Sequence, residues 1–276
     1  METARVKFSI GDIIKDILEN PESSVNNEME IRFRTMTKTK LTKLEFDNII
    51  KKIKSLNFTT LKPLGEYQLK IQGESGDIRT EVKGLSSIQS YCKSDTLVDN
   101  TMDITYMSKR NASIGKVVVN PIDNDDFGFR VSYQSEDMKT IQMPDIVELK
   151  TKWDTIKKNF RFINRVSFTN PSFPFKIDMS VVKSSYSAKH TTIKESGVFN
   201  SNETYEVEIE VLNDMIKSFG TVKMIETMLK NTIKIILSGI QNTNYPISIQ
   251  NETQVKNAYY KLLHGKEKSI LSPRDF

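Results

Sequence analysis

One segment near the C-terminal end of the chain places a glutamate at every second position. Between Tyr205 and Val211, Glu206, Glu208 and Glu210 alternate with tyrosine, valine and isoleucine. Side chains alternate between the two faces of a β-strand, so the pattern predicts a strand with one apolar face and carboxylates about 6.7 Å apart on the other. A solvated acidic face is the plain alternative, although like charges in a row repel one another.

A second segment, from Glu28 to Phe33, repeats this alternation close to the N-terminus. Glu28, Glu30 and Arg32 share one face, and the residues between them are apolar. If the two glutamate strands meet in one sheet, their carboxylates form an all-oxygen site for a hard divalent cation. Mg²⁺ or Mn²⁺ in such a site bridges to phosphate oxygens, so the two segments together predict metal-assisted phosphate chemistry.

Basic residues follow the same spacing in the middle of the chain. Arg161 and Arg165 share a face of one predicted strand with Ile163 and Ser167, and further basic residues lie on or beside other strands: Arg79, Lys109, Arg110, Arg130, Lys176 and Lys183. One guanidinium group can donate two parallel hydrogen bonds to two oxygens of a phosphate, and a triphosphate needs several such groups. Acidic terminal strands and basic central strands together indicate a β-barrel with a polar interior.

The elements that position these residues are predicted from periodicity and punctuation. Thr42, with Glu45 three positions later, is typical of a capping box and begins a helix. Helical spacing predicts helices over 10–18, 42–54, 145–159, 222–240 and 252–263. Alternation predicts strands over 28–34, 67–71, 77–83, 102–107, 116–119, 127–133, 160–168, 175–182 and 205–211. Eight or nine antiparallel strands with helices at both ends favour a barrel or a sandwich.

Composition sets broader limits. The 276 residues carry a net charge of +5, which mildly favours a polyanionic partner such as polyphosphate or an RNA 5′ end. The single cysteine, Cys92, excludes an intrachain disulfide and a cysteine-based zinc site. The sequence has neither a signal peptide nor a long apolar run, so we expect an intracellular protein with no membrane partner.

These segments resemble the motifs of the triphosphate tunnel metalloenzymes, specifically the metal-dependent RNA 5′-triphosphatases of fungi and of large DNA viruses. In those viruses the fold forms the first domain of the mRNA capping enzyme. The first motif of the family looks like Glu28 to Phe33, and the last looks like Tyr205 to Glu210. The segments 160–168 and 176–183 are similar in order and spacing to the viral paired basic strands, and Phe129 to Glu136 looks like the strand that orients the attacking water.

The resemblance implies an α+β fold, an antiparallel eight-stranded barrel that forms a triphosphate tunnel with a polar interior and is flanked by helices at both ends. It implies that Glu28, Glu30, Glu208 and Glu210 bind Mg²⁺ or Mn²⁺, with Arg32 and Glu206 in support. Phosphate contacts would come from Arg79, Lys109, Arg130, Arg161, Arg165, Lys176 and Lys183. Glu136 would position the attacking water, and Asp178 would orient its neighbours; with Arg161 and Arg165 these are the candidate catalytic residues.

One position departs from the family. Relatives have Arg-x-Lys-x-Arg in the central basic strand, whereas Ile163 stands here in place of the lysine, and Lys109 or Lys176 is a candidate replacement. The motifs end at residue 211. We therefore expect a tunnel domain over 1–211 with its N-terminal helices, and C-terminal helices over 212–276 that pack on the barrel or lead to a following domain.

By the same resemblance the chain removes the γ-phosphate of nascent mRNA as the first step of cap formation. Its partners would be 5′-triphosphate RNA and guanylyltransferase and methyltransferase domains of the same polypeptide, in host cytoplasm or a virion. The ending Ser272 to Phe276 looks like a cut between domains, which suggests an excised N-terminal domain.

Two alternatives stay open on the sequence. The first is another enzyme of the tunnel fold, a tripolyphosphatase, a nucleoside triphosphatase or a polyphosphate polymerase. The second is a basic RNA-binding β protein without catalysis, although aromatic residues are not interleaved with basic ones on a single strand face here: Phe160 and Phe162 flank Arg161 but point the other way.

Overall fold

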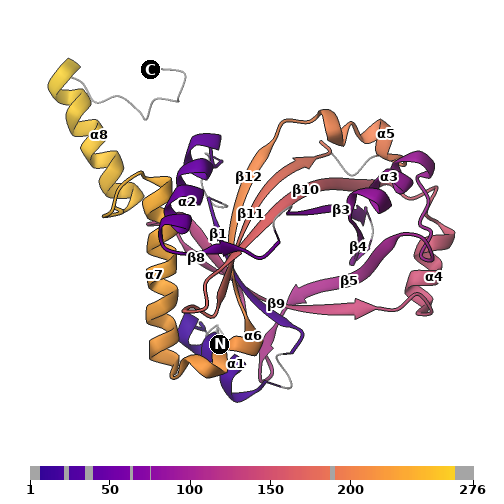
Figure 1. Ribbon diagram of the computed structural model, residues 1–276, viewed down its shortest axis with the longest axis horizontal. Coiled ribbons are helices and arrows are strands. Elements are labelled where there is room, and N and C mark those ends of the chain that lie inside the picture. The colour runs from indigo at the N-terminus through magenta and orange to yellow at the C-terminus, as the bar shows by residue number, and fades with distance from the viewer. Residues whose placement is uncertain are drawn as a thin grey trace, which may run out of the picture.

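The computed structural model describes residues 7–21, 25–34, 40–62, 65–74, 76–186 and 190–264. Eight antiparallel strands close into a barrel in the order β1-β12-β11-β10-β3-β4-β5-β9, and β9 pairs again with β1 (Figure 1). The strands are β1 (Asn27–Phe33), β3 (Glu66–Gly73), β4 (Ile78–Lys83), β5 (Asp103–Asn111), β9 (Phe129–Lys139), β10 (Lys158–Thr169), β11 (Phe175–Ser184) and β12 (Thr204–Val211). The predicted eight-stranded antiparallel barrel is confirmed.

Closure of the barrel makes the first and last strands neighbours. Glu30 lies opposite Glu210 and Arg32 opposite Glu208 in the register of β1 and β12. The two glutamate segments, about 180 residues apart in the sequence, therefore present their charged faces side by side to the interior.

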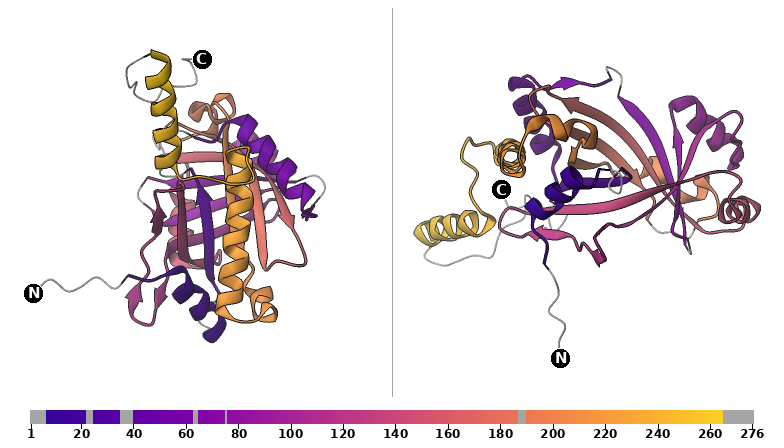
Figure 2. Two further views of the ribbon diagram at one scale, coloured as in Figure 1. Left: turned by 90° about the vertical axis from the view of Figure 1, so that its left-hand side faces the viewer. Right: turned by 90° about the horizontal axis from the view of Figure 1, so that it is seen from below.

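The hydrophobic core lies outside the barrel, because the strands turn their apolar faces outward. Helices α1 (Ile10–Glu19), α2 (Lys43–Ser55) and α7 (Val222–Ile240) cover the outer faces of β1, β12 and β11, and Met29, Ile31 and Ile209 are completely or almost completely buried beneath them (Figures 1 and 2). Each of the three helices begins at a residue whose hydroxyl caps it: Ser9, Thr42 and Thr221. The capping box predicted at Thr42 and Glu45 is present.

A second, smaller core lies on the opposite wall. Helix α3 (Leu85–Ser94) packs Tyr91 against Trp153 and Phe160, on the outer faces of β3, β4 and β10. Helices α4 (Pro144–Thr151) and α5 (Ile193–Ser196) and the 3-10 turn Val198–Asn200 complete this side. With apolar material on both outer walls, the barrel interior is left free for polar side chains.

Two predicted elements are much shorter in the structure, and one observed helix was not predicted. The expected helix over 145–159 ends at Thr151, because Trp153 turns into the second core and β10 begins at Lys158. The expected strand over 116–119 is only β7 (Val117–Val118), paired with β6 (Ser113–Ile114) in a separate hairpin. Helix α3 was not predicted, since its first turn, Leu85 to Ile88, carries two serines among its apolar residues.

The remaining elements sit at the margins of the barrel. Short strands β2 (Thr59–Thr60) and β8 (Ile122–Asn124) extend the sheet at β10 and β9, and α6 (Asn213–Ile216) and a 3-10 turn (Lys217–Phe219) lead into α7. Helix α8 (Ile249–His264) stands away from the barrel in Figure 1. The expected domain cut at Ser272 to Phe276 lies outside the described residues. Within the described ranges, no helix combines the length and apolar character needed to cross a membrane.

Candidate active site

A polar tunnel runs through the barrel, formed by the inward faces of the eight strands. Two cavities of about 270 and 520 Å³ fill it. They are two parts of one space, since both are lined by Arg32, Lys70, Arg79, Lys109, Arg165 and Glu208.

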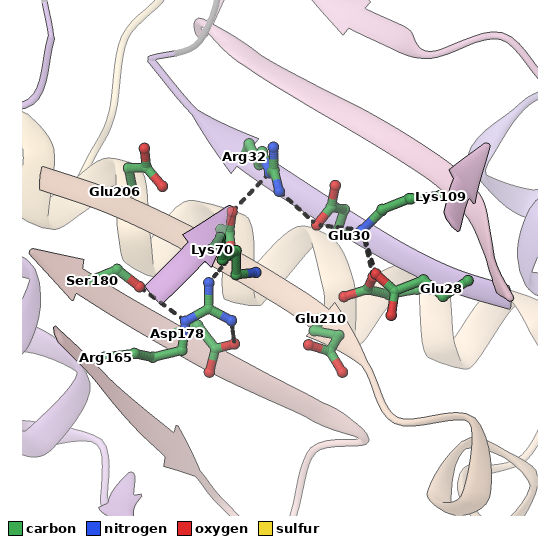
Figure 3. Close-up of polar contacts among 12 residues, drawn as sticks. Glu28, Glu30, Arg32, Lys70, Lys109, Arg165, Asp178, Ser180, Glu206 and Glu210 are labelled. Carbon is green, nitrogen blue, oxygen red and sulfur yellow. Dashed lines mark hydrogen bonds and ion pairs between the residues drawn. The ribbon is translucent and has the colours of Figure 1, made fainter. Parts of the chain in front are cut away.

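The larger cavity contains the glutamates that the sequence singled out. Lys109 lies among them: its Nζ is 2.6 Å from Glu28 Oε2, 3.7 Å from Glu30 Oε2 and 3.1 Å from Glu136 Oε1 (Figure 3). Lys176 Nζ lies 2.8 Å from Glu210 Oε2. The carboxylates of β1 and β12 are therefore held by lysines from β5 and β11.

Burial and neighbouring charges shift the pKa values of these glutamates in different directions. Burial raises the pKa of Glu210 to about 7, and the negative charge of Glu28 adds to this while Lys176 opposes it. Burial also raises the pKa of Glu30. Burial would also raise the pKa of Glu28, but the nearby ammonium of Lys109 has the larger effect, so the pKa of Glu28 is lowered. Burial therefore sets the direction of the pKa shift at Glu30 and Glu210, whereas Lys109 sets it at Glu28.

This donor set fits a hard divalent cation in its chemistry. Glu28, Glu30 and Glu210 carry carboxylates on two paired strands and line the same cavity, and all-oxygen donor sets of this kind suit Mg²⁺ or Mn²⁺. As the side chains of the described residues stand, no three acidic groups are arranged around one point as metal ligands. Lys109 and Lys176 instead contact the carboxylates of Glu28 and Glu210.

Arg165 is the most firmly held cation of the tunnel. Its Nη1 donates to Asp178 Oδ2 at 2.9 Å, its Nη2 to Glu208 Oε2 at 2.8 Å, and its Nε to Ser180 Oγ at 3.0 Å. Although burial alone would lower the pKa of Arg165, the charges of Glu208 and Asp178 raise it. Arg165 is therefore always charged and is fixed in direction, as a phosphate clamp must be.

Asp178 holds this arrangement from beneath. Its side chain is buried, and Ser167 Oγ donates to Asp178 Oδ1 at 2.5 Å while Lys176 Nζ lies 3.5 Å from Oδ2. Because every contact of the carboxylate goes to β10 or to its own strand, Asp178 orients the basic side chains around it.

Arg161 and Arg79 are two further guanidinium groups of the tunnel. Arg161 Nη2 donates to both carboxylate oxygens of Glu206, at 2.7 and 2.8 Å. Arg79 Nε lies 3.0 Å from Glu81 Oε1, and its Nη2 lies 3.3 Å from Glu136 Oε1. Both guanidinium groups border the smaller cavity.

Two expected phosphate contacts lie elsewhere. Lys183 is on the outer face of β11, and its Nζ donates to the backbone oxygen of Phe199 at 3.0 Å. Arg130 pairs with Asp123 of β8, with 2.6 Å between Nε and Oδ1. Neither residue lines either tunnel cavity.

Lys70 is a tunnel residue that was missed in the sequence. It lies opposite Arg161 in the register of β3 and β10, beside Ile163, and its Nζ is 3.2 Å from Glu81 Oε1. Burial lowers the pKa of this lysine. In the sequence, Gln68, Lys70 and Gln72 alternate with apolar residues. This pattern predicts that Lys70 lies on the polar, inward face of the strand. Lys70 therefore supplies a cation near the position where Ile163 has none.

Comparison with known proteins is informative only at the level of structure, since no family model and no curated protein matches the chain. The chain is similar to the RNA triphosphatase domain of a trifunctional mimivirus mRNA capping enzyme, with a TM-score of 0.53, 19% identity, and coverage of 83% of this chain and 99% of that one. Another structure of the mimivirus capping enzyme triphosphatase gives a TM-score of 0.51 and 16% identity, over 82% and 95% of the two chains.

The RNA triphosphatase Pct1 of S. pombe matches more distantly, with a TM-score of 0.45 and 14% identity over 84% and 88%, and this likeness carries no argument. The mimivirus comparisons show that the chain has the fold of these RNA triphosphatases, a closed eight-stranded tunnel. At such identities they show the fold alone.

Proposed function

We propose that this chain is a metal-dependent RNA 5′-triphosphatase, which hydrolyses the γ-phosphate of a 5′-triphosphate end in the tunnel. The observation that carries the proposal is the convergence of Glu28, Glu30 and Glu210 with fixed guanidinium groups in one enclosed space. Similarity in fold to the mimivirus triphosphatase domain supports it.

Positive charge and positioning carry most of the catalysis in phosphoryl transfer, because negative charge is spread over the transferred group in the transition state. Glu28, Glu30 and Glu210 would hold Mg²⁺ or Mn²⁺, with Glu208 beside them, and the cation when bound withdraws charge from the γ-phosphate. Arg32 and Glu206 support this set: Arg32 Nε lies 2.7 Å from Glu208 Oε1, and Glu206 is bound by Arg161.

The basic residues hold the phosphates. Arg161, Arg165 and Arg79 point their guanidinium groups into the tunnel, and Lys70, Lys109 and Lys176 add ammonium groups around them. Each now contacts a carboxylate, so a phosphate exchanges one anionic partner for another and finds its donors already oriented. The tunnel is thus prepared for an anion with several charges.

Glu136 is the candidate for positioning the attacking water. Its side chain lines the larger cavity and is partly exposed, and the contacts from Lys109 and Arg79 both go to Oε1, close to Glu28. Removal of the γ-phosphate from RNA leaves a diphosphate end. The proposed role is therefore the first step of cap formation, with guanylyltransferase and methyltransferase domains as partners.

A substrate comparison tests this proposal. Phosphate release should be measured in Mg²⁺ or Mn²⁺ from triphosphate-ended RNA, ATP and inorganic tripolyphosphate under identical conditions. We expect the highest kcat/KM with RNA and none of the three reactions in EDTA. Cleavage of tripolyphosphate with RNA left intact would reject the RNA assignment and favour a tripolyphosphatase of the same fold. RNA binding without any hydrolysis would favour a binding module.

A further inference from the structure

A side pocket opens from the tunnel where β1 and β12 separate. The last pair in their register is Arg32 opposite Glu208. Arg34 then adopts a left-handed backbone conformation, with φ of 61°, and its N–H donates to the backbone oxygen of Gly128 at 2.7 Å. The end of β1 therefore follows β9, and beyond Glu208 the edge of β12 is met only by Leu41, which bridges Tyr205, among the described residues.

The pocket has an apolar floor and a basic rim. Phe33, Leu41 and Val207 are buried and form its floor, and the bridge between Leu41 and Tyr205 bounds it. Arg34 and exposed Lys40 stand at its rim. Its volume is about 280 Å³. In the smaller tunnel cavity, by contrast, Ile163 is the only apolar side chain among the described lining residues.

The pocket is continuous with the part of the tunnel that holds Arg161. Arg32, Glu206 and Glu208 line both the pocket and the smaller tunnel cavity. Glu206 is also the partner of Arg161. A ligand that leaves the tunnel beside Arg161 therefore meets the pocket next.

We propose that this pocket binds the first nucleoside of the substrate, the base and ribose that follow the 5′-triphosphate; the inference rests on the proposed function. The acidic end of the tunnel, at Glu28 and Glu210, fixes the position of the γ-phosphate. Glu206 lies four residues from Glu210 on the same strand, about 13 Å away along it, so the phosphate chain runs toward Arg161 and its nucleoside end emerges there.

The chemistry of the pocket matches a nucleoside better than another phosphate. A base has apolar faces that pack on side chains such as Phe33 and Leu41, and its polar edge needs hydrogen-bonding groups at the margin. The Thr204 hydroxyl lines the pocket; it donates to the backbone oxygen of Val182 at 3.1 Å and so can only accept a hydrogen bond from the base. Lys40 and Arg34 add positive charge at the rim, although Arg34 Nη2 already lies 3.2 Å from Glu45 Oε1, so Lys40 is the cation we expect to meet the next phosphodiester of an RNA.

Comparing substrates with and without a nucleoside distinguishes the contribution of the pocket to catalysis from that of the tunnel. Lys40→Glu reverses the charge of the rim, and Thr204→Trp fills the pocket from its margin. We expect each variant to lower kcat/KM for a triphosphate-ended dinucleotide by about tenfold or more, the effect of losing one well-placed contact, and to change that for tripolyphosphate little. Lys230→Glu, an equal charge change on exposed α7, serves as the control and should affect neither substrate. Equal losses on both substrates, or no loss on either, would overturn the pocket assignment.

Photolabelling with 8-azido-ATP tests the same pocket without relying on turnover. Label should appear on peptides that contain Leu41 or Tyr205, should be displaced by unlabelled ATP, and should fall in the Thr204→Trp variant. Label confined to other peptides would contradict the inference even if wild-type protein hydrolyses RNA. Absence of hydrolysis with label in the pocket would instead reject the proposed function and leave the nucleoside site standing.

Discussion

Arg165 illustrates how individual residues prepare the tunnel for phosphate. Three of its nitrogens are engaged, by Asp178, Glu208 and Ser180, so its direction is set before any ligand arrives. A lysine has one compact ammonium group and could not bridge these three partners.

Arg165→Lys should therefore lower kcat for γ-phosphate release by about 100-fold or more, as the loss of a preorganised donor typically does, with the circular dichroism spectrum unchanged. Arg130→Lys is the matched control, because Arg130 pairs with Asp123 outside both tunnel cavities, and it should stay near wild-type activity. An equal loss of kcat in the two variants would contradict a special role for Arg165 in the tunnel.

Lys158 is a buried cation that serves the scaffold instead of the tunnel. Its Nζ donates to the backbone oxygen of Trp153 and lies 4.7 Å from the centroid of that ring. Burial lowers its pKa from the ordinary value of 10.5. The folded chain therefore releases this proton at a lower pH than the unfolded chain does.

Between the lowered pKa and 10.5 the unfolded state holds more protons at this residue, so stability should rise with pH across that window. Lys158→Met removes this contribution. The free energy of unfolding of the wild type and of Lys158→Met should be measured in urea between about pH 8 and 10. The wild-type value should increase relative to that of the variant as the pH rises. A difference that stays constant with pH would contradict the assignment.

At the scale of elements, most strands and helices were predictable because alternation and helical spacing are local properties. Helix α7 was predicted over the residues that it occupies, and β12 differs from its prediction by one residue. The inward positions of Glu28, Glu208 and Lys176 followed from the same alternation. The pairing of Arg130 with Asp123 of β8 was not predictable, because it depends on tertiary contacts. Lys183 lies an odd number of residues from Lys176, so the alternation already placed it on the outer face and the prediction overlooked this. Lys70 was overlooked although its strand alternates clearly.

Close packing of α7 on α2 is a further property of the elements. A Cβ at Gly239 would lie 2.7 Å from Ile49 Cα, a backbone atom that cannot move alone. Gly239→Ala should cost about 1–3 kcal/mol of stability, as overpacking does in other cores. The urea midpoint should fall relative to wild type and to the exposed control Lys230→Ala, while activity per folded molecule is retained. An unchanged midpoint would show that the two helices can separate freely.

At the scale of the whole molecule, the barrel places its apolar faces outside under helices and collects charge inside. Among the described residues, cations and carboxylates of the tunnel are paired with one another, so metal and phosphate must compete with internal partners. Lys176 Nζ lies 2.8 Å from Glu210 Oε2, so under the proposed function Lys176 would compete with a metal ion for this carboxylate and would be free to contact phosphate if Glu210 bound the ion.

Lys176→Met should then change two affinities in opposite directions. Mn²⁺ binding, measured by calorimetry without phosphate, should tighten by about tenfold because a competing positive charge is gone, whereas KM for the triphosphate substrate should rise. Weaker binding of both ligands would show that Lys176 supports the metal site and does not compete with it.

The central claim is that glutamates from the first and last strands act together in hydrolysis. The direct test is γ-phosphate release from triphosphate-ended RNA by Glu28→Gln and Glu210→Gln, with exposed Glu203→Gln as the matched control. We expect both tunnel variants to fold normally and to lose at least about 100-fold in kcat, and Glu203→Gln to keep wild-type activity. Hydrolysis at the wild-type rate by either tunnel variant would contradict it.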